Sequence, residues 1–478
     1  MSRNLPPIAN GASTAADQFD VAIIGAGVVG CAIARAFAIR GISTLIVEKA
    51  DDILEGASKG NSALLHTGFD EPAGSLELQM LIDGFSTYHR IRERMNLPFL
   101  RTGAHVIAWN EEELHKLPQI AAHGVANGIV TRVIGRDTLL EREPALSPAA
   151  LGAVEVPDEG VIDPWSAPLA YLRQALLHGA QLMLGTEVTS VRRTGERWTI
   201  ATGEGDLSAR IVVNSAGLFG DRVEAMAGRQ PGFTIRPRKG QFVVYDKPAF
   251  SLVKSILLRV PTERTKGVLI SPTIFGNLIV GPTAEDQEDR VHAPVEGDTL
   301  RRIMSEGEIM VPGLEGQTVT AAYAGLRPAT EFRDFVLRSD DAAGWITVGG
   351  IRSTGLSAAL GLGAWAAEQG ARMLGINRPP PSDDDLDWPA MPNLAATCPR
   401  PFESQDRSPI VCHCELVTED EIEAALRGPL PPGTLGGLKR RTRVMMGRCQ
   451  GFGCSGAVRR LAPELFGLHG NELDTDAA

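Results

Sequence analysis

The sequence predicts an α/β fold that combines a Rossmann-type nucleotide-binding domain, an antiparallel-sheet cap and a small helical C-terminal domain that carries cysteines. Three observations support this prediction. A glycine-rich turn joins a strand-like run to a helix-like run near the N-terminus, short strand-like runs follow in the middle of the chain, and four cysteines gather at residues 412–454. A chain of 478 residues is also too long for one hydrophobic core, so two or three domains are expected.

Composition and charge exclude several classes of function. The net charge of −11 argues against general binding to nucleic acid or to an anionic membrane surface. No apolar run approaches the roughly 20 residues that span a bilayer, so no transmembrane segment is expected. Residues 1–18 lack the apolar stretch of a secretory signal, and we interpret them as a disordered arm. Cysteines clustered in one region favour metal binding over a disulfide framework. The expected compartment is therefore the cytoplasm, with peripheral attachment to the inner membrane as the alternative.

The N-terminal region carries a βαβ fingerprint. An apolar run at 19–24 leads into the turn GAGVVG, a helix-like run follows, and a second apolar run at 44–47 ends at an acid. In this fingerprint the glycines allow a tight turn, close approach of a pyrophosphate and packing of the helix, while the acid binds a ribose. The predicted nucleotide-binding residues here are Gly25, Ala26, Gly27, Val28, Val29, Gly30 and Glu48. The fingerprint alone leaves NAD and FAD open.

Residues 48–68 favour FAD by resemblance. Their sequence, EKADDILEGASKGNSALLHTG, resembles a motif of the D-amino-acid-oxidase-like superfamily of FAD enzymes, in the branch with glycerol-3-phosphate dehydrogenases and L-2-hydroxyglutarate oxidases. Residues 211–217, 323–328 and 349–357 resemble later motifs of that branch, in the same order. The resemblance covers residues 19 to about 375 and implies FAD as the cofactor. It adds the FAD-binding candidates Lys49, Ser58, Asn61, Ser62, Val188, Ala216, Gly217, Gly350, Gly355, Leu356 and Ser357.

The remaining runs suggest how domains divide the chain. Four strand-like runs between 187 and 281 are separated by Gly and Asp turns, which is typical of antiparallel sheet. Proline-rich residues 376–408 predict an extended linker. The expected segments are an FAD-dependent oxidoreductase domain at 19–375, with FAD-binding parts at about 19–85, 151–229 and 321–375 and a substrate cap at about 86–150 and 230–320, and a cysteine domain at 409–478.

Four cysteines have the spacing of a metal site. The pattern is C-x-C, 34 residues, then C-x4-C, formed by Cys412, Cys414, Cys449 and Cys454. This spacing leaves open both structural zinc, which usually shows C-x2-4-C pairs, and a 2Fe–2S cluster. Residues 411–415, 437–443 and 446–451 resemble the bacterioferritin-associated-ferredoxin-type domain, which is found fused behind some glycerol-3-phosphate dehydrogenases. This resemblance implies that the four cysteines hold a 2Fe–2S cluster. The basic residues of 439–443 are then expected to compensate the charge of the cluster.

Three side chains are candidates for the reaction itself. His66 lies in the FAD-adjacent motif and titrates near neutral pH, so we predict that it takes the proton of a substrate hydroxyl. Arg327 lies in the motif that resembles the family's substrate-side strand, and its guanidinium suits a carboxylate or phosphate. Arg352 would add a second positive group, which favours a doubly anionic substrate.

These features predict an FAD-dependent dehydrogenase that oxidises a small anionic polyol phosphate or 2-hydroxy acid, with glycerol 3-phosphate as the lead. Electrons would pass through the iron–sulfur centre to a quinone or an electron-transfer protein. Two alternatives stay open: a dehydrogenase for amino acids or amines of the opine or hydroxyproline type or for L-2-hydroxyglutarate, and a non-enzymatic flavin and iron–sulfur redox sensor. A partner subunit or a second copy of the chain is a further expected partner, and nucleic acid is not.

Overall fold

An eight-stranded sheet forms the centre of what we call the nucleotide domain. The computed structural model describes residues 18–261, 267–377 and 379–467, so the predicted arm at 1–18 lies almost wholly outside the described residues. The sheet order is β10-β11-β12-β1-β2-β9, with β20 beside β12 and β19 beside β20. Its strands are β1 (Gln18–Ile24), β2 (Thr44–Val47), β9 (Gln181–Met183), β10 (Val188–Thr194), β11 (Arg197–Thr202), β12 (Gly205–Asn214), β19 (Val336–Asp340) and β20 (Trp345–Gly349). β1 pairs in parallel with both β12 and β2, which is the Rossmann-type arrangement.

Apolar helices bury the parallel centre of this sheet. They are α1 (Val28–Ala38), α2 (Leu76–Ile91), α5 (Ser166–Leu177) and α8 (Gly355–Met373), and the short α6 (Gly220–Met226) follows β12. α1 packs against α5 and α8, and α8 packs against α2. Strands covered on both faces read as continuous apolar runs, as β2 does with TLIV. None of the described helices is long and apolar enough to cross a membrane.

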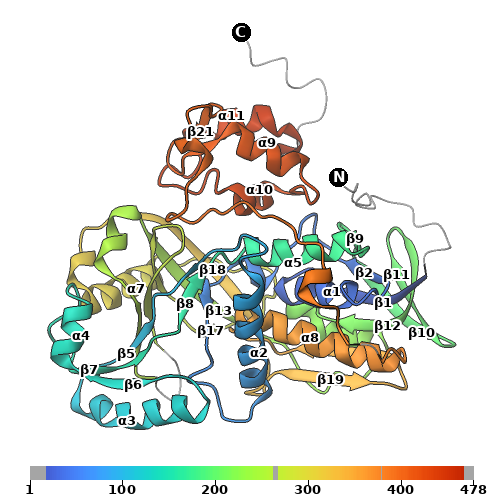
Figure 1. Ribbon diagram of the computed structural model, residues 1–478, viewed down its shortest axis with the longest axis horizontal. Coiled ribbons are helices and arrows are strands. Elements are labelled where there is room, and N and C mark those ends of the chain that lie inside the picture. Colours follow the sequence, from blue (N-terminus) through green and yellow to red (C-terminus); the bar gives the residue numbers. More distant parts are fainter. Residues whose placement is uncertain (1–17, 262–266, 378, 468–478) are drawn as a thin grey trace.

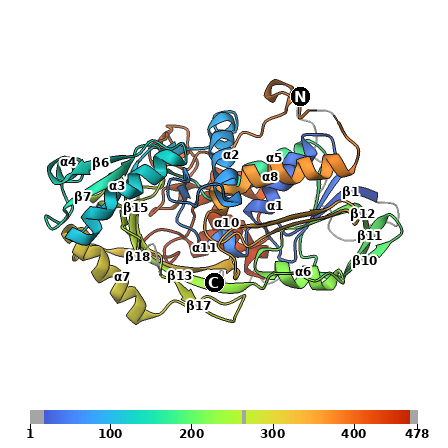
Figure 2. The same cartoon turned by 90° about the horizontal axis from the view of Figure 1, so that it is seen from below.

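A nine-stranded sheet forms the cap. Its order is β17-β13-β16-β15-β14-β5-β7-β6, with β18 on β13. Every pair is antiparallel except β5 with β14. The strands are β5 (Ala104–Ala108), β6 (Arg132–Gly135), β7 (Gly152–Val156), β13 (Arg236–Tyr245), β14 (Ile256–Arg259), β15 (Leu269–Pro272), β16 (Leu278–Gly281), β17 (Glu285–Asp286) and β18 (Val319–Ala329), and the helices are α3 (Glu111–Ala126), α4 (Arg136–Arg142) and α7 (Gly297–Met310). The cap and the sheet of the nucleotide domain lie at opposite ends of the body (Figure 2).

Two cap strands lie outside the ranges that the sequence predicts for the cap. The predicted boundaries assign β7 and most of β18 to FAD-binding segments, but both strands belong to the cap sheet. β18 pairs with β13 from Ala329 opposite Arg236 to Val319 opposite Tyr245. A small sheet of β3 (Leu64–Leu65), β8 (Gly160–Ile162) and β4 (Phe99–Leu100) lies where the chain passes from one domain to the other. The chain thus crosses between the domains several residues away from the predicted boundaries.

The proline-rich segment forms a packed strap. Within its described part it contains only short 3-10 turns, at Asp383–Asp385 and Pro401–Glu403, and no α-helix or strand. Met391 and Leu394 are buried, and the Met391 N–H donates to the Met95 carbonyl at 3.1 Å. The segment is therefore irregular, as its composition predicts, but it is fixed along the body and does not hang free.

The cysteine domain follows the strap and sits on top of the body, with α10 on the side that faces it (Figure 1). Its elements are β21 (Ile410–Cys412), β22 (Val417–Thr418), α9 (Glu419–Arg427), α10 (Leu435–Thr442) and α11 (Ser455–Leu461). Thr418 and Glu421 form a capping box that starts α9. The domain has its own core, which includes Ile422, Leu438 and Val458 together with two of the cysteines.

Candidate functional site

The glycine turn lies between the carboxyl end of β1 and the start of α1. A Cβ on Gly30 would lie 1.9 Å from the Gly25 carbonyl oxygen, so only glycine permits this crossing of helix and strand. Glu48 follows β2, and its carboxylate accepts a hydrogen bond from the Ala26 N–H at 2.7 Å. Burial raises the pKa of Glu48. Gly27 has no side chain that could cap α1, so the first turn of this helix offers N–H groups to an anion.

The loop after β2 bends over the same turn. Ser58 Oγ accepts a hydrogen bond from the Val28 N–H at 3.0 Å, at the first residue of α1. Asn61 donates to the Ser58 carbonyl at 2.9 Å, and the Asn61 carbonyl accepts from the Tyr323 hydroxyl at 2.6 Å. The turn after β12 closes the other side, where the Ser215 N–H donates to the Ile24 carbonyl at 3.1 Å. Residues far apart in sequence thus meet at the carboxyl ends of β1, β2 and β12, where open α/β sheets bind nucleotide cofactors.

The other predicted FAD-binding residues lie around this point or at the start of α8. Lys49 Nζ lies over the ring of Phe219, 3.6 Å from its centroid. Thr354 does not cap α8 with its side chain, so this longer helix also presents uncapped N–H groups. Val29 is in the first turn of α1, Ser62 follows Asn61, Ala216 and Gly217 are in the turn after β12, Gly350 follows β20, Gly355, Leu356 and Ser357 start α8, and Val188 is buried at the start of β10.

His66 is held on two sides. Its N–H donates to Ser357 Oγ at 2.8 Å, which ties the residue to the start of α8. Its ring Nδ1 lies 3.4 Å from Glu159 Oε2. The other oxygen of Glu159 accepts hydrogen bonds from the backbone N–H and the hydroxyl of Thr67, both at 2.8 Å. The Glu159 side chain is buried, with 1% of its surface exposed. The sequence did not predict this residue, because it lies in a turn between two strands and is distant from His66 along the chain.

Arg327 has no carboxylate partner in the described part of the chain. Its guanidinium donates there to three backbone carbonyls, those of Arg238, Lys239 and Thr283, at 3.3–3.5 Å. Within the described residues no carboxylate lies within ion-pair distance of it. Enclosure by the protein lowers the pKa of Arg327 to about 10, with nearby Arg238 contributing, so the group stays charged at neutral pH. Part of its surface remains accessible.

Two other cations, Lys239 and the predicted site residue Arg352, are neutralised. Lys239 pairs with Glu296 at 2.6 Å and with Glu285 at 3.1 Å. Arg352 lies 3.5 Å from the buried carboxylate of Glu77 and donates to the Arg333 carbonyl. The structure therefore gives Arg327 and Arg352 different surroundings, and only Arg327 presents a charge that no described carboxylate meets.

The four cysteines of the predicted metal site converge in two pairs. The thiols of Cys414 and Cys449 influence each other, and those of Cys412 and Cys454 do so too. Burial, with the nearby Cys412, raises the pKa of Cys454 to about 12. Backbone N–H groups, that of Gly453 above all, lower the pKa of Cys449.

This donor set fits a two-iron cluster. Each iron of such a cluster takes two thiolates, and N–H groups aimed at the sulfurs are the contacts that tune it. The two thiol pairs can supply the four thiolates that such a cluster needs.

The basic run of α10 makes contacts other than the predicted ones. Arg440 binds Glu55 and Arg441 binds Asp52, and both carboxylates belong to the nucleotide domain. Arg443 binds Glu415 at 2.8 Å. The expectation that these residues compensate the charge of the cluster is therefore wrong for Arg440 and Arg441, because carboxylates across the domain boundary already neutralise them.

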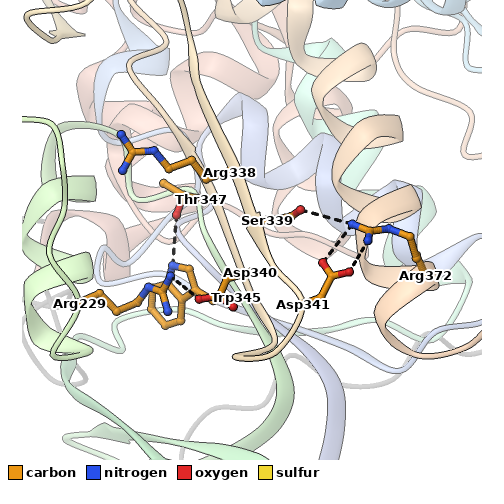
Figure 3. Close-up of a pocket in the computed structure, with 8 residues that line it drawn as sticks. All are labelled: Arg229, Arg338, Ser339, Asp340, Asp341, Trp345, Thr347 and Arg372. Atoms are coloured by element: carbon orange, nitrogen blue, oxygen red, sulfur yellow. Dashed lines mark hydrogen bonds and ion pairs between the residues drawn. The ribbon is translucent and has the colours of Figure 1, made fainter.

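A surface hollow of about 680 Å³ lies apart from these residues (Figure 3). It contains three arginines, but Arg229 pairs with Asp340 at 3.0 Å and Arg372 pairs with Asp341. Arg338 donates to two backbone carbonyls. None of the predicted site residues lines the hollow, so we do not regard it as the reaction site.

Comparisons with known proteins agree with this geometry. A family model described as FAD dependent oxidoreductase matches residues 20–369. A second model, described as BFD-like 2Fe-2S binding domain, matches residues 410–463.

Some relatives match this chain over most of its length and most of their own. A glycerol 3-phosphate dehydrogenase of Caloramator mitchellensis is 31% identical over 96% of this chain and 97% of its own length. One subunit of the anaerobic glycerol-3-phosphate dehydrogenase of Escherichia coli K12 is 30% identical, over 91% of this chain and 86% of its own. The solved structure of the L-alpha-glycerophosphate oxidase of Mycoplasma pneumoniae, dithionite reduced with FAD bound, has a TM-score of 0.69 and 25% identity, over 79% of this chain and 97% of that one.

Proposed function

Because the chain belongs to the family of FAD-dependent oxidoreductases and carries a BFD-like 2Fe–2S domain, we propose that it is a glycerol-3-phosphate dehydrogenase. Electrons would leave through the iron–sulfur centre to a quinone or an electron-transfer protein. The observation that carries the substrate class is Arg327, an enclosed guanidinium that no described carboxylate neutralises. A charge kept in such a place is costly unless a ligand pairs with it, and a phosphate or carboxylate is the matching ligand. The glycerol-3-phosphate relatives favour the phosphate.

Each set of site residues would have its own role when FAD is bound. FAD supplies the hydride acceptor when it is bound. Arg327 would hold the anionic group of the substrate and so orient the carbon that loses hydride. His66 would take the hydroxyl proton at Nε2, the ring nitrogen that does not face Glu159. The cofactor itself would be held by the glycine turn, the loop of Ser58 and Asn61, and the first turn of α8.

Glu159 would position His66. A carboxylate at Nδ1 fixes the orientation of the ring and stabilises the imidazolium that forms when the base accepts a proton. The two hydrogen bonds from Thr67 hold the carboxylate in place while it does so.

Replacing Glu159 by glutamine is expected to slow substrate-driven flavin reduction by about 10- to 100-fold with little change in KM. The acid limb of the pH–rate profile should move to lower pH, because a neutral amide no longer favours the protonated ring. Stopped-flow flavin reduction across pH measures both effects. Asp158→Asn is the matched control, since this adjacent carboxylate pairs at the surface with Arg101 at 3.2 Å. An unshifted profile in Glu159→Gln would contradict the positioning role.

The substrate proposal is tested by anaerobic addition of candidate substrates to the FAD-loaded protein. Glycerol 3-phosphate at millimolar concentration should bleach the flavin absorbance. Bleaching by proline, hydroxyproline, opines or L-2-hydroxyglutarate instead would replace it with one of the alternatives. If no small substrate sustains turnover with an artificial acceptor, a redox sensor becomes the better account.

A further inference from the structure

Helix α10 of the cysteine domain lies on the loop that follows β2, residues 49–62, which we call the flavin loop. Arg441 makes two bonds of 2.8 Å to the two carboxylate oxygens of Asp52. The Asp52 side chain is fully buried, and that of Arg441 is 7% exposed. Beside this pair, Arg440 bonds to Glu55 and to the Ile53 carbonyl, and the Thr434 hydroxyl donates to Glu55 at 3.0 Å. The cysteine domain thus supplies the cation for Asp52 and one of the two cations for Glu55, the other being Lys59 of the loop itself at 3.4 Å.

The approach of the helix to the loop is close. A Cβ on Gly437 would lie 1.6 Å from Asp52 Oδ2, so a glycine is needed where α10 meets the loop. The Gly433 N–H also donates to Asp52, at 3.2 Å. The hydrogen bonds and charge of Arg440 hold the pKa of Glu55 below its usual value although burial alone would raise it. These contacts are therefore a built interface between the domains.

The opposite side of the flavin loop touches the glycine turn. The Leu54 N–H donates to the Ala26 carbonyl at 3.1 Å, and Leu54 has a φ of +66°, a left-handed conformation that costs energy for leucine. Ser58 accepts from the Val28 N–H at the start of α1. The conformation of the loop therefore needs support from outside. α10 gives this support at Asp52 and Glu55, while Tyr323 of β18 binds the far end of the loop at the Asn61 carbonyl.

We propose that docking of α10 holds the flavin loop in the conformation that binds FAD, so that FAD affinity depends on the cysteine domain through Arg441 and Arg440. These arginines are positioning residues, because they act through Asp52 and Glu55. Without them Asp52 would keep a buried charge with no cation, or leave the protein interior together with the loop. Loading of FAD would then be tightest after the cysteine domain has folded around its cluster, which orders the assembly of the two cofactors. The identity of the substrate does not enter this dependence.

The test compares the FAD dissociation constants of full-length variants that have been stripped of FAD and retain their iron. Arg441→Met is expected to weaken FAD binding by at least about 30-fold, and Arg440→Met by less, because Glu55 is partly exposed. Arg448→Met is the matched control: it removes a cross-domain ion pair with Asp246, at 2.8 Å, that does not involve the flavin loop. Its FAD affinity should stay within about twofold of the parent.

A second variant, Glu55→Gln, tests the proposal even if Arg441→Met disturbs the cysteine domain. This change leaves α10 intact and removes one loop carboxylate, so iron content should stay normal while FAD affinity falls severalfold. Hydrogen exchange of residues 49–62 should rise in the same variants. Unchanged FAD affinity in Arg441→Met, or in Glu55→Gln if Arg441→Met loses iron, would overturn the proposal.

Discussion

Replacing Arg327 by glutamine should lower kcat/KM for glycerol 3-phosphate by about 100- to 1000-fold while the protein still binds FAD. The reason is that a charged, enclosed anchor for an anion contributes about 2–5 kcal/mol, and each factor of ten in rate corresponds to about 1.4 kcal/mol. Arg327→Lys keeps the charge but loses the two-pronged geometry, so it should recover only part of the loss. Steady-state kinetics with an artificial acceptor measure both variants.

Two other arginines, Arg338 and Arg352, serve as comparisons for Arg327. Arg338 also donates to backbone carbonyls, those of Pro231 and Gly232, but on the surface, so Arg338→Gln should leave kcat/KM within about twofold. Arg352→Gln should have a smaller effect than Arg327→Gln, because Glu77 already neutralises Arg352. If Arg352→Gln proves the more damaging of the two, the anion is bound at the start of α8 and our assignment of Arg327 is wrong.

Cys454→Ser should remove the iron–sulfur cluster. Cys454 and Cys412 are buried in the core of the cysteine domain, so the loss of one ligand removes both the metal and a packed side chain. Because metal binding energy becomes folding energy in small metal domains, the domain should also melt at lower temperature. Iron content should fall from about two per chain to near zero, as metal analysis and visible spectra will show.

Cys398→Ser is the control for that variant. Cys398 lies in the strap, packed near Phe275 and Leu394 and outside the cysteine domain. Its replacement should leave iron content and the visible spectrum of the cluster unchanged. A parent protein that contains one zinc and no iron would contradict the cluster assignment directly.

The sequence was most informative where the residues of a predicted site lie close together along the chain. The glycine turn and Glu48 lie within one βαβ unit, and the cysteines stand close together in two short motifs, so pattern and resemblance together sufficed to predict them as site residues. The sequence did not point to Glu159 or Asp52. Their partners, His66 and Arg441, are distant along the chain, and only the fold brings them into contact. The boundaries of the cap were wrong at β7 and β18 for a related reason. The sheet to which a strand belongs depends on the strand it pairs with. β18 pairs with β13, which is distant from it along the chain.

The arginines of α10 illustrate how composition can mislead. A basic run beside four thiolates suggests compensation of the charge of the cluster, yet the structure directs two of those side chains away to Asp52 and Glu55. The positive charges are present as the sequence indicates, but their partners lie on the other domain. Only the three-dimensional contacts connect the iron–sulfur domain to the flavin loop.

The central claim is that one chain joins oxidation of a small anionic substrate to an iron–sulfur outlet. The most direct test is anaerobic addition of glycerol 3-phosphate to protein loaded with both cofactors, with flavin absorbance and the EPR signal of the reduced cluster recorded on the same sample. We expect the flavin to bleach and the cluster signal to appear, with neither change when glycerol replaces the phosphorylated substrate. A flavin that stays oxidised, or one that bleaches while the cluster stays oxidised, would contradict the account.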